Sequence, residues 1–330
     1  MTELWKLTGC FGERQRHGGR LLSDAVLDLC AEREVATSLL LRAAAGFGLR
    51  HHLRTDETLT MSEDPSMVAV AVDERPRLEP VVDALLGIQQ RGLLTVERVQ
   101  RYPDLPDSAE VKLTVHLGRD ERAGGGPSYV AVCELLRQHG VAGASVLVGV
   151  DGTSRGRRER ARFFGRNRAV PAMVHAVGAT DRVRSAVPAV QEVLPGAVLT
   201  VERVRICKRD GALLCGPSGL AGPGEWQRLT VYTSEHHLVD GEPVHRAIVH
   251  RLRGGPARGA TVLRGTWGFH GDHAPHGDRL WQLGRRVPVV TTLVDTPDRI
   301  EAAFGLVDEL TAQHGLVTTE LVPRAVTPGS

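Results

Sequence analysis

The sequence predicts an α+β fold in which one βαββαβ unit of about 100 residues occurs three times in tandem. The hexapeptide LTVERV stands at 94–99 and again at 199–204. Longer segments align in the same order, because KLTGCFGERQRHGGRLLSDAV (6–26) resembles KLTVHLGRDERAGGGPSYVAV (112–132) and RLTVYTSEHHLVDGEPVHRAI (228–248). Internal similarity at a fixed period is the signature of a repeat architecture, so the repeat decides the fold.

The elements of one unit follow from its local patterns. Each copy opens with an alternating, β-prone segment (KLTGCF, KLTVHL or RLTVYT) that predicts a strand. A glycine-rich loop follows, and LLSDAVLDLCAERE (21–34) has the apolar spacing of a helix. The segments ATSLLLRAA, GASVLVGVD and GATVLRGTW predict a buried second strand, followed by a polar loop of about 20 residues. The third strand is MVAVAVD, MVHAVG or VVTTLVD, and an LTVERV-type strand closes the unit after a second helix, expected near 75–91, 180–193 and 296–313.

This order is that of the ferredoxin-like split unit. Helices cover one face of such a sheet, and the other face must be buried against something else. Three copies in one chain supply that partner, so we expect three sheets that face inward around a pseudo-threefold axis, an intramolecular pseudo-trimer. Segments rich in Pro, Gly and Asp separate the copies, which gives repeats at 1–100, 110–206 and 226–324, linkers at 101–109 and 207–225, and a tail at 325–330.

The composition is that of an ordinary soluble globular chain, with 42% apolar and 24% charged residues. The net charge of +2 favours neither nucleic acid nor an anionic membrane as a partner. The chain does not open with a charged region followed by an apolar one, and its five scattered cysteines do not form a disulfide framework. The expected location is therefore the cytoplasm.

Four segments resemble a known family. GERQRHGGRLL (12–22), AAAGFG (43–48), SEDPSMVAVAVD (62–73) and, in the third copy, VLRGTWGFH (262–270) are similar to the PII-like family DUF190. The resemblance covers nearly the whole chain and implies the ferredoxin-like PII fold, which is usually a trimer of single domains. Many members are encoded near fluoride channels, which implies a regulatory, non-enzymatic role. A single chain that builds the trimer by itself is expected to be monomeric.

The resemblance also implies a ligand and a partner. PII proteins bind adenine nucleotides and other small metabolites in clefts between neighbouring subunits, and their long loop reaches a target protein. The resemblance implies that the target of this chain is a membrane channel or another protein. By resemblance, Gly46, Phe47 and Gly48 open that loop in copy one, and Gly268 and Phe269 open it in copy three. These five residues are also ligand-binding candidates, expected across the cleft from the glycine-rich loop. Copy two departs from the motif, with Thr153 after Gly152. The Gly-Asp-Gly-Lys-like phosphate loop of PII has no counterpart in QQRGLLTV, LPGAVLTV or QHGLVTT, so tight ATP binding of the PII kind is not predicted.

The loop GERQRHGGR (12–20) allows two interpretations. Backbone N–H groups at a helix N-terminus attract anions, and arginine adds charge-assisted contacts to phosphate or carboxylate. Alternatively, the loop is a turn whose glycines adopt positive φ and whose arginines are solvated. Copy three (SEHHLVDGE) loses most of this positive charge, so the clefts are expected to be unequal. The candidate anion-binding residues are Arg14, Arg16, His17, Gly18, Gly19, Arg20, Arg42, Arg119, Arg122 and Arg264.

Two alternative functions belong to other classes. HGDHAPHGD (270–278) places His270, His273 and His276 three residues apart, and imidazole and carboxylate groups bind Zn²⁺, Ni²⁺ or Cu²⁺. This pattern indicates a CutA-like metal-binding protein, whereas degenerate repeats without any ligand would make a scaffold. The basic long-loop segments 48–54 and 154–166 are solvated faces or docking sites for an acidic partner or nucleic acid. Few aromatic residues lie among these charges, which disfavours nucleic acid. The sequence contains no nucleophile elbow, Walker loop, Rossmann fingerprint or zincin motif, so an enzyme is not predicted.

Overall fold

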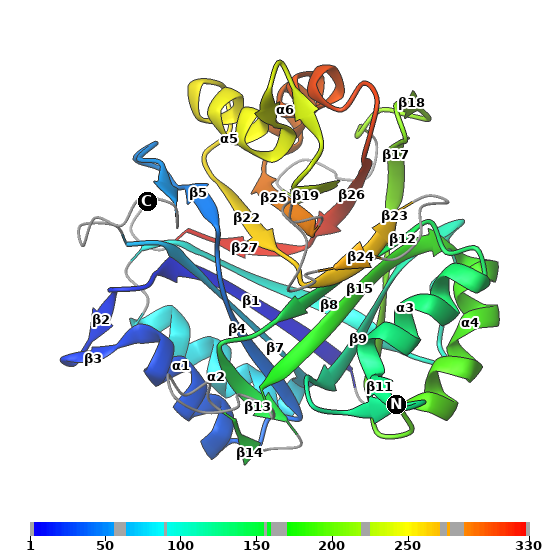
Figure 1. The fold of residues 1–330 in the computed structure, drawn as a ribbon. Helices are drawn as coiled ribbons and strands as arrows, with labels where there is room; N and C mark the ends of the chain where they lie inside the picture. The colour runs from blue at the N-terminus through cyan, green and yellow to red at the C-terminus, as the bar shows by residue number, and fades with distance from the viewer. Residues whose placement is uncertain are drawn as a thin grey trace.

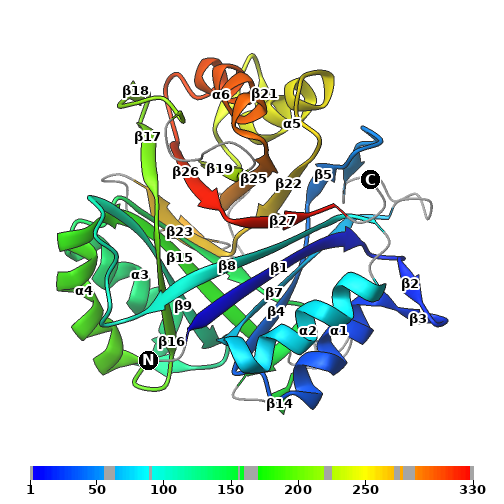
Figure 2. The same cartoon turned by 180° about the vertical axis from the view of Figure 1, so that it is seen from behind.

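Six helices and antiparallel strands make up the part of the chain that the computed structural model describes, which comprises residues 3–55, 64–88, 91–154, 157–159, 170–218, 225–270, 276–277 and 287–327. The predicted α+β class is confirmed at this level. Helix pairs lie at three corners of the molecule and strands fill the space between them (Figure 1). The reverse view shows the same arrangement (Figure 2). No helix in the described ranges is long and apolar enough to cross a membrane.

Each repeat contributes four long strands and two helices. In repeat 1 the sheet order is β4-β7-β1-β8, and the elements are β1 (Leu4–Gly12), α1 (Leu22–Glu32), β4 (Thr37–Arg42), β7 (Ser66–Glu74), α2 (Arg75–Ile88) and β8 (Leu93–Arg101). Helix α1 forms because its apolar residues recur every three or four positions; it buries this stripe on the sheet. Helix α2 is described as far as Ile88, and residues 89 and 90 of the expected helix lie outside the described residues.

Repeats 2 and 3 have the same order of elements. The sheet of repeat 2 is ordered β12-β15-β9-β16, from β9 (Glu110–Gly118), α3 (Ser128–Gln138), β12 (Gly143–Val148), β15 (Pro171–Ala179), α4 (Thr180–Val193) and β16 (Val198–Arg203). The sheet of repeat 3 is ordered β22-β25-β19-β26, from β19 (Trp226–Ser234), α5 (Val244–Gly254), β22 (Ala260–Arg264), β25 (Pro288–Asp295), α6 (Pro297–Leu310) and β26 (Leu316–Val322).

A short hairpin joins the first strand of each repeat to its first helix. Its strands are β2 (Arg16–His17) and β3 (Arg20–Leu21) in repeat 1, β10 (Arg122–Ala123) and β11 (Gly126–Pro127) in repeat 2, and β20 (Leu238–Val239) and β21 (Glu242–Pro243) in repeat 3. The sequence predicts only a loop here. The β2–β3 hairpin projects from the body of the molecule (Figure 1).

The repeats exchange short strands in a closed cycle. The start of each long loop, which the sequence predicts to be polar loop, instead forms a strand on a neighbouring sheet: β5 (Ala45–Phe47) of repeat 1 pairs with β22 of repeat 3, β13 (Asp151–Ser154) of repeat 2 pairs with β4 of repeat 1, and β23 (Trp267–His270) of repeat 3 pairs with β12 of repeat 2. Each continues into a two-residue strand, β6 (Arg54–Thr55), β14 (Arg157–Arg158) or β24 (His276–Gly277). The sequence therefore underestimates how strongly the repeats are joined.

A second set of pairings runs in the opposite direction around the cycle. The end of β8 pairs with β16 of repeat 2, β17 (Arg205–Arg209) after repeat 2 pairs with β26 of repeat 3, and β27 (Arg324–Val326) after repeat 3 pairs with β8 of repeat 1. A further strand, β18 (Ala212–Leu213), pairs with β17. Every repeat thus shares backbone hydrogen bonds with both other repeats.

Each sheet is buried on both faces. Its outer face packs on the helices of its own repeat, which gives three separate apolar clusters. The inner faces meet in one further cluster, to which all three repeats contribute, including Leu41, Val70, Met173, Tyr232 and Val290. Burial on both faces explains why strands such as β9 are almost continuously buried.

Candidate functional site

The glycines of the predicted anion loop form a tight two-residue turn. Gly18 and Gly19 have φ values of 55° and 81°, and the corresponding turn of repeat 2, at Gly124 and Gly125, has 58° and 82°. Two central residues with positive φ define the type I′ turn of a two-residue hairpin, which favours glycine and asparagine or aspartate. Repeat 3 has Asp240 before glycine at this position, with a φ of 50°. The turn interpretation therefore accounts for the glycines.

The basic residues of the β2–β3 hairpin lie on its exposed surface. Arg16 donates a hydrogen bond from Nη1 to the Gly19 carbonyl at 2.8 Å, which closes the turn. The backbone N–H of Arg14 donates to Asp64 Oδ1 at 2.6 Å. The side chains of Arg16 and His17 are exposed, as are those of Arg119 and Arg122 at the repeat 2 hairpin. The two hairpins present separate basic surfaces rather than the walls of one pocket.

One hairpin arginine belongs to an ionic network that crosses between repeats. Arg20 pairs with Asp28 on α1, and the other carboxylate oxygen of Asp28 pairs with Arg158 from the long loop of repeat 2. Arg158 also donates to Asp24 at 2.9 Å and to Asp151 Oδ2 at 2.7 Å. The hydrogen bond to Asp151, followed by the other carboxylates, raises the pKa of Arg158 above its usual value despite partial burial. This network fastens the repeat 2 loop to the helix that follows the β2–β3 hairpin.

Two further predicted arginines are held by carboxylates of their own repeats. Arg42 lies 3.2 Å from Glu13, and Arg264 lies 3.1 Å from Glu235 at the matching place in repeat 3. Repeat 2 has Arg119 where the other repeats have this glutamate. In repeats 1 and 3, an anionic ligand would therefore compete with an existing ion pair for these arginines.

The Gly-Phe motif joins the repeats. A Cβ atom at Gly46 would lie 2.7 Å from the Ala260 carbonyl oxygen of repeat 3, and one at Gly268 would lie 2.3 Å from that of Ala144 in repeat 2. Glycine is therefore required for the close approach of β5 and β23 to their partners. Phe47 is buried in the core of repeat 3 and Phe269 in that of repeat 2, so neither faces the hairpin as a wall of a ligand cleft.

At the Gly-Phe motif, repeat 2 has Gly152 and Thr153. Thr153 takes the place of the phenylalanine, and its hydroxyl donates to the Val35 carbonyl at 3.2 Å and bonds Ser38 Oγ at 2.8 Å in repeat 1. A Cβ at Gly152 would lie 2.2 Å from the Ser38 carbonyl oxygen. Gly48, by contrast, is exposed and has open space around its Cβ position. In copy two, hydrogen bonds of Thr153 therefore hold the exchanged strand on its neighbour, where the other two copies use a buried phenylalanine.

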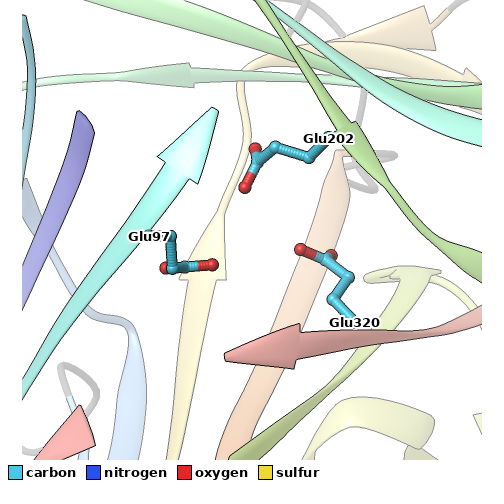
Figure 3. A group of neighbouring side chains, drawn as sticks. All are labelled: Glu97, Glu202 and Glu320. Carbon is cyan, nitrogen blue, oxygen red and sulfur yellow. The ribbon is translucent and has the colours of Figure 1, made fainter. Parts of the chain in front are cut away.

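A ring of six buried charges lies where the three sheets meet. The three glutamates converge from β8, β16 and β26 (Figure 3). Three cations from the first strands of the repeats alternate with them, so the ring (hereafter the ion ring) is closed and consists of Lys6, Glu97, Arg228, Glu320, Lys112 and Glu202. None of the six residues is more than 8% exposed. Each cation contacts the glutamate of its own repeat and that of one neighbour.

The contacts of the ion ring are short on both sides of each cation. Arg228 donates to both carboxylate oxygens of Glu97, at 2.6 and 2.7 Å, and lies 3.3 Å from Glu320. Lys112 lies 2.5 Å from Glu320 and 3.4 Å from Glu202. Lys6 lies 3.3 Å from Glu97 and also pairs with Glu202. The ring therefore joins all three repeats through charge-assisted contacts.

The charges of the ion ring balance. Burial alone would raise the pKa of Glu202, but Lys112 and Lys6 beside it hold that pKa at about 2. Arg228 and Lys6 likewise lower the pKa of Glu97 against the effect of its burial. Carboxylate oxygens of the three glutamates lie within 4.8 Å of one another, a spacing that could hold a cation. The three basic side chains already neutralise them, so we assign the ring a structural role.

Sequence reasoning missed the ion ring, although its signal is visible. The basic residue of KLT, KLT and RLT and the glutamate of LTVERV, LTVERV and TTELV recur at one position in all three copies. The cross-strand register pairs them directly, Lys6 with Glu97, Lys112 with Glu202 and Arg228 with Glu320. Opposite charges directly opposite each other on adjacent strands stabilise a sheet. Their recurrence in triplicate is the feature that could have identified them.

Two histidines adjoin the ion ring on the sheet of repeat 2. His116 is buried on β9, four residues after Lys112 and hence on the same face of the strand. Burial, opposed by Glu202 and assisted by Lys6, lowers the pKa of His116 to about 4. Burial and the nearby Lys112 also lower the pKa of His175 on β15. Both imidazoles are therefore neutral at pH 7.

Acidification is expected to destabilise the fold before the ring carboxylates titrate. In the unfolded chain His116 takes up a proton near pH 6.5, whereas in the folded chain it does so only near pH 4. The unfolded state therefore binds more protons in this interval, and the free energy of unfolding falls by about 3 kcal/mol as the pH drops from 6.5 to 4. Urea unfolding of wild type and His116→Leu between pH 7 and 4 measures this; parallel pH curves for the two proteins would contradict it.

A small cavity lies inside repeat 1. It is lined by Ser38 of β4 and by apolar residues of β1, β7 and the two helices, and Gly9 lies there where repeats 2 and 3 have Val115 and Val231. Its volume is about 10 Å³. That is room for about one water molecule, so this cavity is too small for a nucleotide.

The histidines of the predicted metal loop separate in the structure. His270 ends β23, is buried, and lies 5.0 Å from His237 between ring centroids. His273 lies outside the described residues, and His276 is described only as the first backbone position of β24. The predicted trio is therefore not placed together by the described residues, whereas His270 joins histidines that are distant in sequence.

Comparison with known proteins finds a related sequence and solved structures that are similar to parts of this chain. A "UPF0166 protein" of Aquifex aeolicus (strain VF5) is 29% identical over 93 residues, which is 28% of this chain and 86% of that protein. Among solved structures, an unknown protein from Galdieria sulphuraria covers 61% of this chain and 98% of its own, at 13% identity and a TM-score of 0.19. A structure described as an anthrone oxidase-like protein covers 70% and 97%, at 14% identity and a TM-score of 0.19.

The family model gives the decisive match. The model of DUF190, described as "Uncharacterized ACR, COG1993", matches the chain three times, at residues 5–101, 110–206 and 226–324. Each match contains one β1-like strand, one hairpin, two helices and one glutamate of the ion ring. The chain belongs to the DUF190 family, and it carries three tandem copies of the family's unit.

Proposed function

We propose that this chain is a cytoplasmic, non-enzymatic regulator of the PII-like kind, which binds a small anion at the basic hairpin of repeat 1 and signals to a partner protein through its long loops. The architecture that we propose is a pseudo-trimer of three ferredoxin-like units. The two opposite cycles of strand exchange support it, because each repeat pairs with the other two in the same two ways. A chain closed on itself in this way supports a monomer as the working unit.

The observation that carries the proposal is the position of Asp28. Its carboxylate pairs with Arg20 of the exposed hairpin on one side and with Arg158 of the repeat 2 loop on the other. Arg20 is 63% exposed at its side chain, so a dissolved anion can reach it. The Asp28 carboxylate thus connects the basic surface of the β2–β3 hairpin, which suits an anionic ligand, to the long loop of repeat 2.

The coupling follows from competition for Arg20. An anion that binds Arg14, Arg16 and Arg20 takes Arg20 away from Asp28, which strengthens the remaining pair of Asp28 with Arg158. The long loop of repeat 2 is then held more firmly in the ligand-bound state than in the free state. Such a difference between two states is what a ligand needs in order to shift a conformational equilibrium. The ligand class is an adenine nucleotide or a simpler anion, and the partner that we propose is a protein such as a membrane channel rather than a nucleic acid.

Thermal unfolding against a panel of anions tests this function. We expect one member among ATP, ADP, AMP, cyclic nucleotides, bicarbonate and fluoride to stabilise the full chain. A ligand at about one hundred times its dissociation constant adds roughly 2.7 kcal/mol to the free energy of unfolding. The Arg16→Ala/His17→Ala variant should lose this stabilisation, because both side chains belong to the proposed anion surface.

Two further variants make the test specific. Arg184 is an exposed arginine on α4, away from the hairpin, so Arg184→Ala should respond like wild type. Asp28→Asn should still bind the anion, but hydrogen exchange at 157–159 should no longer slow when the anion is added. An equal response of wild type and Arg16→Ala/His17→Ala would remove the hairpin from the site, and no response to any anion would favour the scaffold.

A further inference from the structure

Four histidines converge at the junction of repeats 2 and 3. The histidine cluster consists of His236, His237, His270 and His314, with His237 at its centre. The ring centroid of His237 lies 4.4 Å from that of His314, 4.5 Å from that of His236 and 5.0 Å from that of His270. As the described rings stand, no three nitrogens of the cluster lie within 4.8 Å of one another, so imidazoles that share one metal ion would first have to rotate.

Three separate parts of the fold deliver these rings. His236 and His237 follow β19, His270 ends β23 where that strand pairs with β12 of repeat 2, and His314 precedes β26. Asp210, which follows β17 of repeat 2, lies 3.8 Å from Nδ1 of His270. The cluster therefore stands where the two repeats are joined by strand exchange on both sides.

The fold itself does not require histidine at these places. In repeat 1 the four matching positions hold Arg14, Gln15, Gly48 and Arg91, and none of them is an imidazole. Because the same backbone is built in repeat 1 without histidine, the four imidazoles of repeat 3 need another explanation. A function confined to this one junction supplies it.

The cluster runs from the interior to the surface. His237 and His270 are each 6% exposed, whereas His236 and His314 are exposed. Nδ1 of His236 lies 2.6 Å from Ser234 Oγ. A hydrogen bond to Nδ1 of this kind orients a ligand imidazole and leaves its Nε2 to face the metal. The cluster thus combines two buried inner rings, two exposed outer rings and access from solvent.

We propose that the histidine cluster binds one divalent transition-metal ion of the zinc, copper or nickel class. Imidazole nitrogen is a preferred ligand of these metals, with a Zn–N distance of about 2.0–2.1 Å. His314 now stacks on His237 at an interplanar angle of 22°, so binding requires the exposed ring of His314 to turn a nitrogen toward the buried pair. The site is independent of the anion function, which concerns repeats 1 and 2, and it draws only on His270 from the loop motif at 270–278.

Zinc titration of the full, tag-free chain tests the site. Competition with a chromogenic chelator should give one tightly bound zinc per chain. The double variant His236→Gln/His314→Gln changes exposed side chains only and should unfold at the same temperature as wild type without metal. Its zinc affinity should fall by more than about tenfold, as expected when groups of a metal site are removed. Cobalt should give the visible absorption of a low-coordinate nitrogen site in wild type and not in the variant.

A matched histidine provides the control. His250 is a half-exposed histidine on α5 that contacts Glu242, outside the cluster, so His250→Gln should bind zinc like wild type. Zinc held only by the loop at 270–278 would be unaffected by His236→Gln/His314→Gln. Unchanged zinc affinity in that variant, or the absence of stoichiometric binding to wild type, would overturn the proposal.

Discussion

Replacing Glu202 by Gln is expected to lower the free energy of unfolding by about 3–5 kcal/mol, because one partner of a buried ionic network is removed while the others stay buried. Glu202 is in contact with Lys6 and Lys112, and all three side chains are buried. After the substitution three cations face two carboxylates in the ion ring. Urea unfolding at pH 7 measures the loss.

A second substitution separates charge balance from simple loss of packing. Adding Lys112→Met to Glu202→Gln restores two cations and two carboxylates, so the double variant should be more stable than the sum of the single effects predicts. Coupling of about 0.5–3 kcal/mol is usual for residues in one network. The exposed pair Arg75–Glu79 on α2 is the control, and Glu79→Gln should leave the free energy of unfolding nearly unchanged. If Glu202→Gln costs no more than Glu79→Gln, the ring does not hold the repeats together.

The ion ring illustrates which features of this fold can be predicted from the sequence and which cannot. The recurrence of LTVERV predicts the tandem repeat, and the local periodicities predict the long strands and helices, because both depend on residues near in sequence. Alternation in a strand assigns a charged residue to a solvent-facing side, and that rule fails for Glu97 and its counterparts. The inner face of each sheet is covered only when three distant copies meet. A pattern within a single copy therefore carries no sign that these charges are buried.

The sites differ from the predictions for a similar reason. The glycine pairs of the hairpins form a local turn, which is one of the two interpretations that the sequence allows. The histidines were grouped by nearness in the chain, which joined His270 to His273 and His276, whereas the structure places His270 beside His237. The strand formed by Ala45–Phe47 is only three residues long and too short for a periodic signal. Its partner lies on repeat 3, more than 200 residues away.

Gly268→Ala is expected to separate β23 from β12 and to destabilise the chain by about 3 kcal/mol, the upper part of the range usual for forcing extra atoms into a packed site. The added Cβ would lie 2.3 Å from the Ala144 carbonyl oxygen and 3.1 Å from Pro288 Cγ. The first neighbour is backbone inside a sheet and cannot rotate away. Relief requires the strand to move, and Phe269 would then leave the core of repeat 2.

Hydrogen exchange distinguishes this local separation from general weakening. Amides of β12 (Gly143–Val148) should exchange faster in Gly268→Ala, since β12 would become an edge strand at that side. Gly48→Ala is the matched control, because its Cβ meets open space, and it should leave both stability and exchange unchanged. Equal stability of the two variants would mean that the close approach at Gly268 is dispensable. If instead Gly268→Ala alone loses protection in β12, then the Gly-Phe motif is explained by strand exchange, and the search for a ligand is directed to the hairpins and the histidine cluster rather than to this motif.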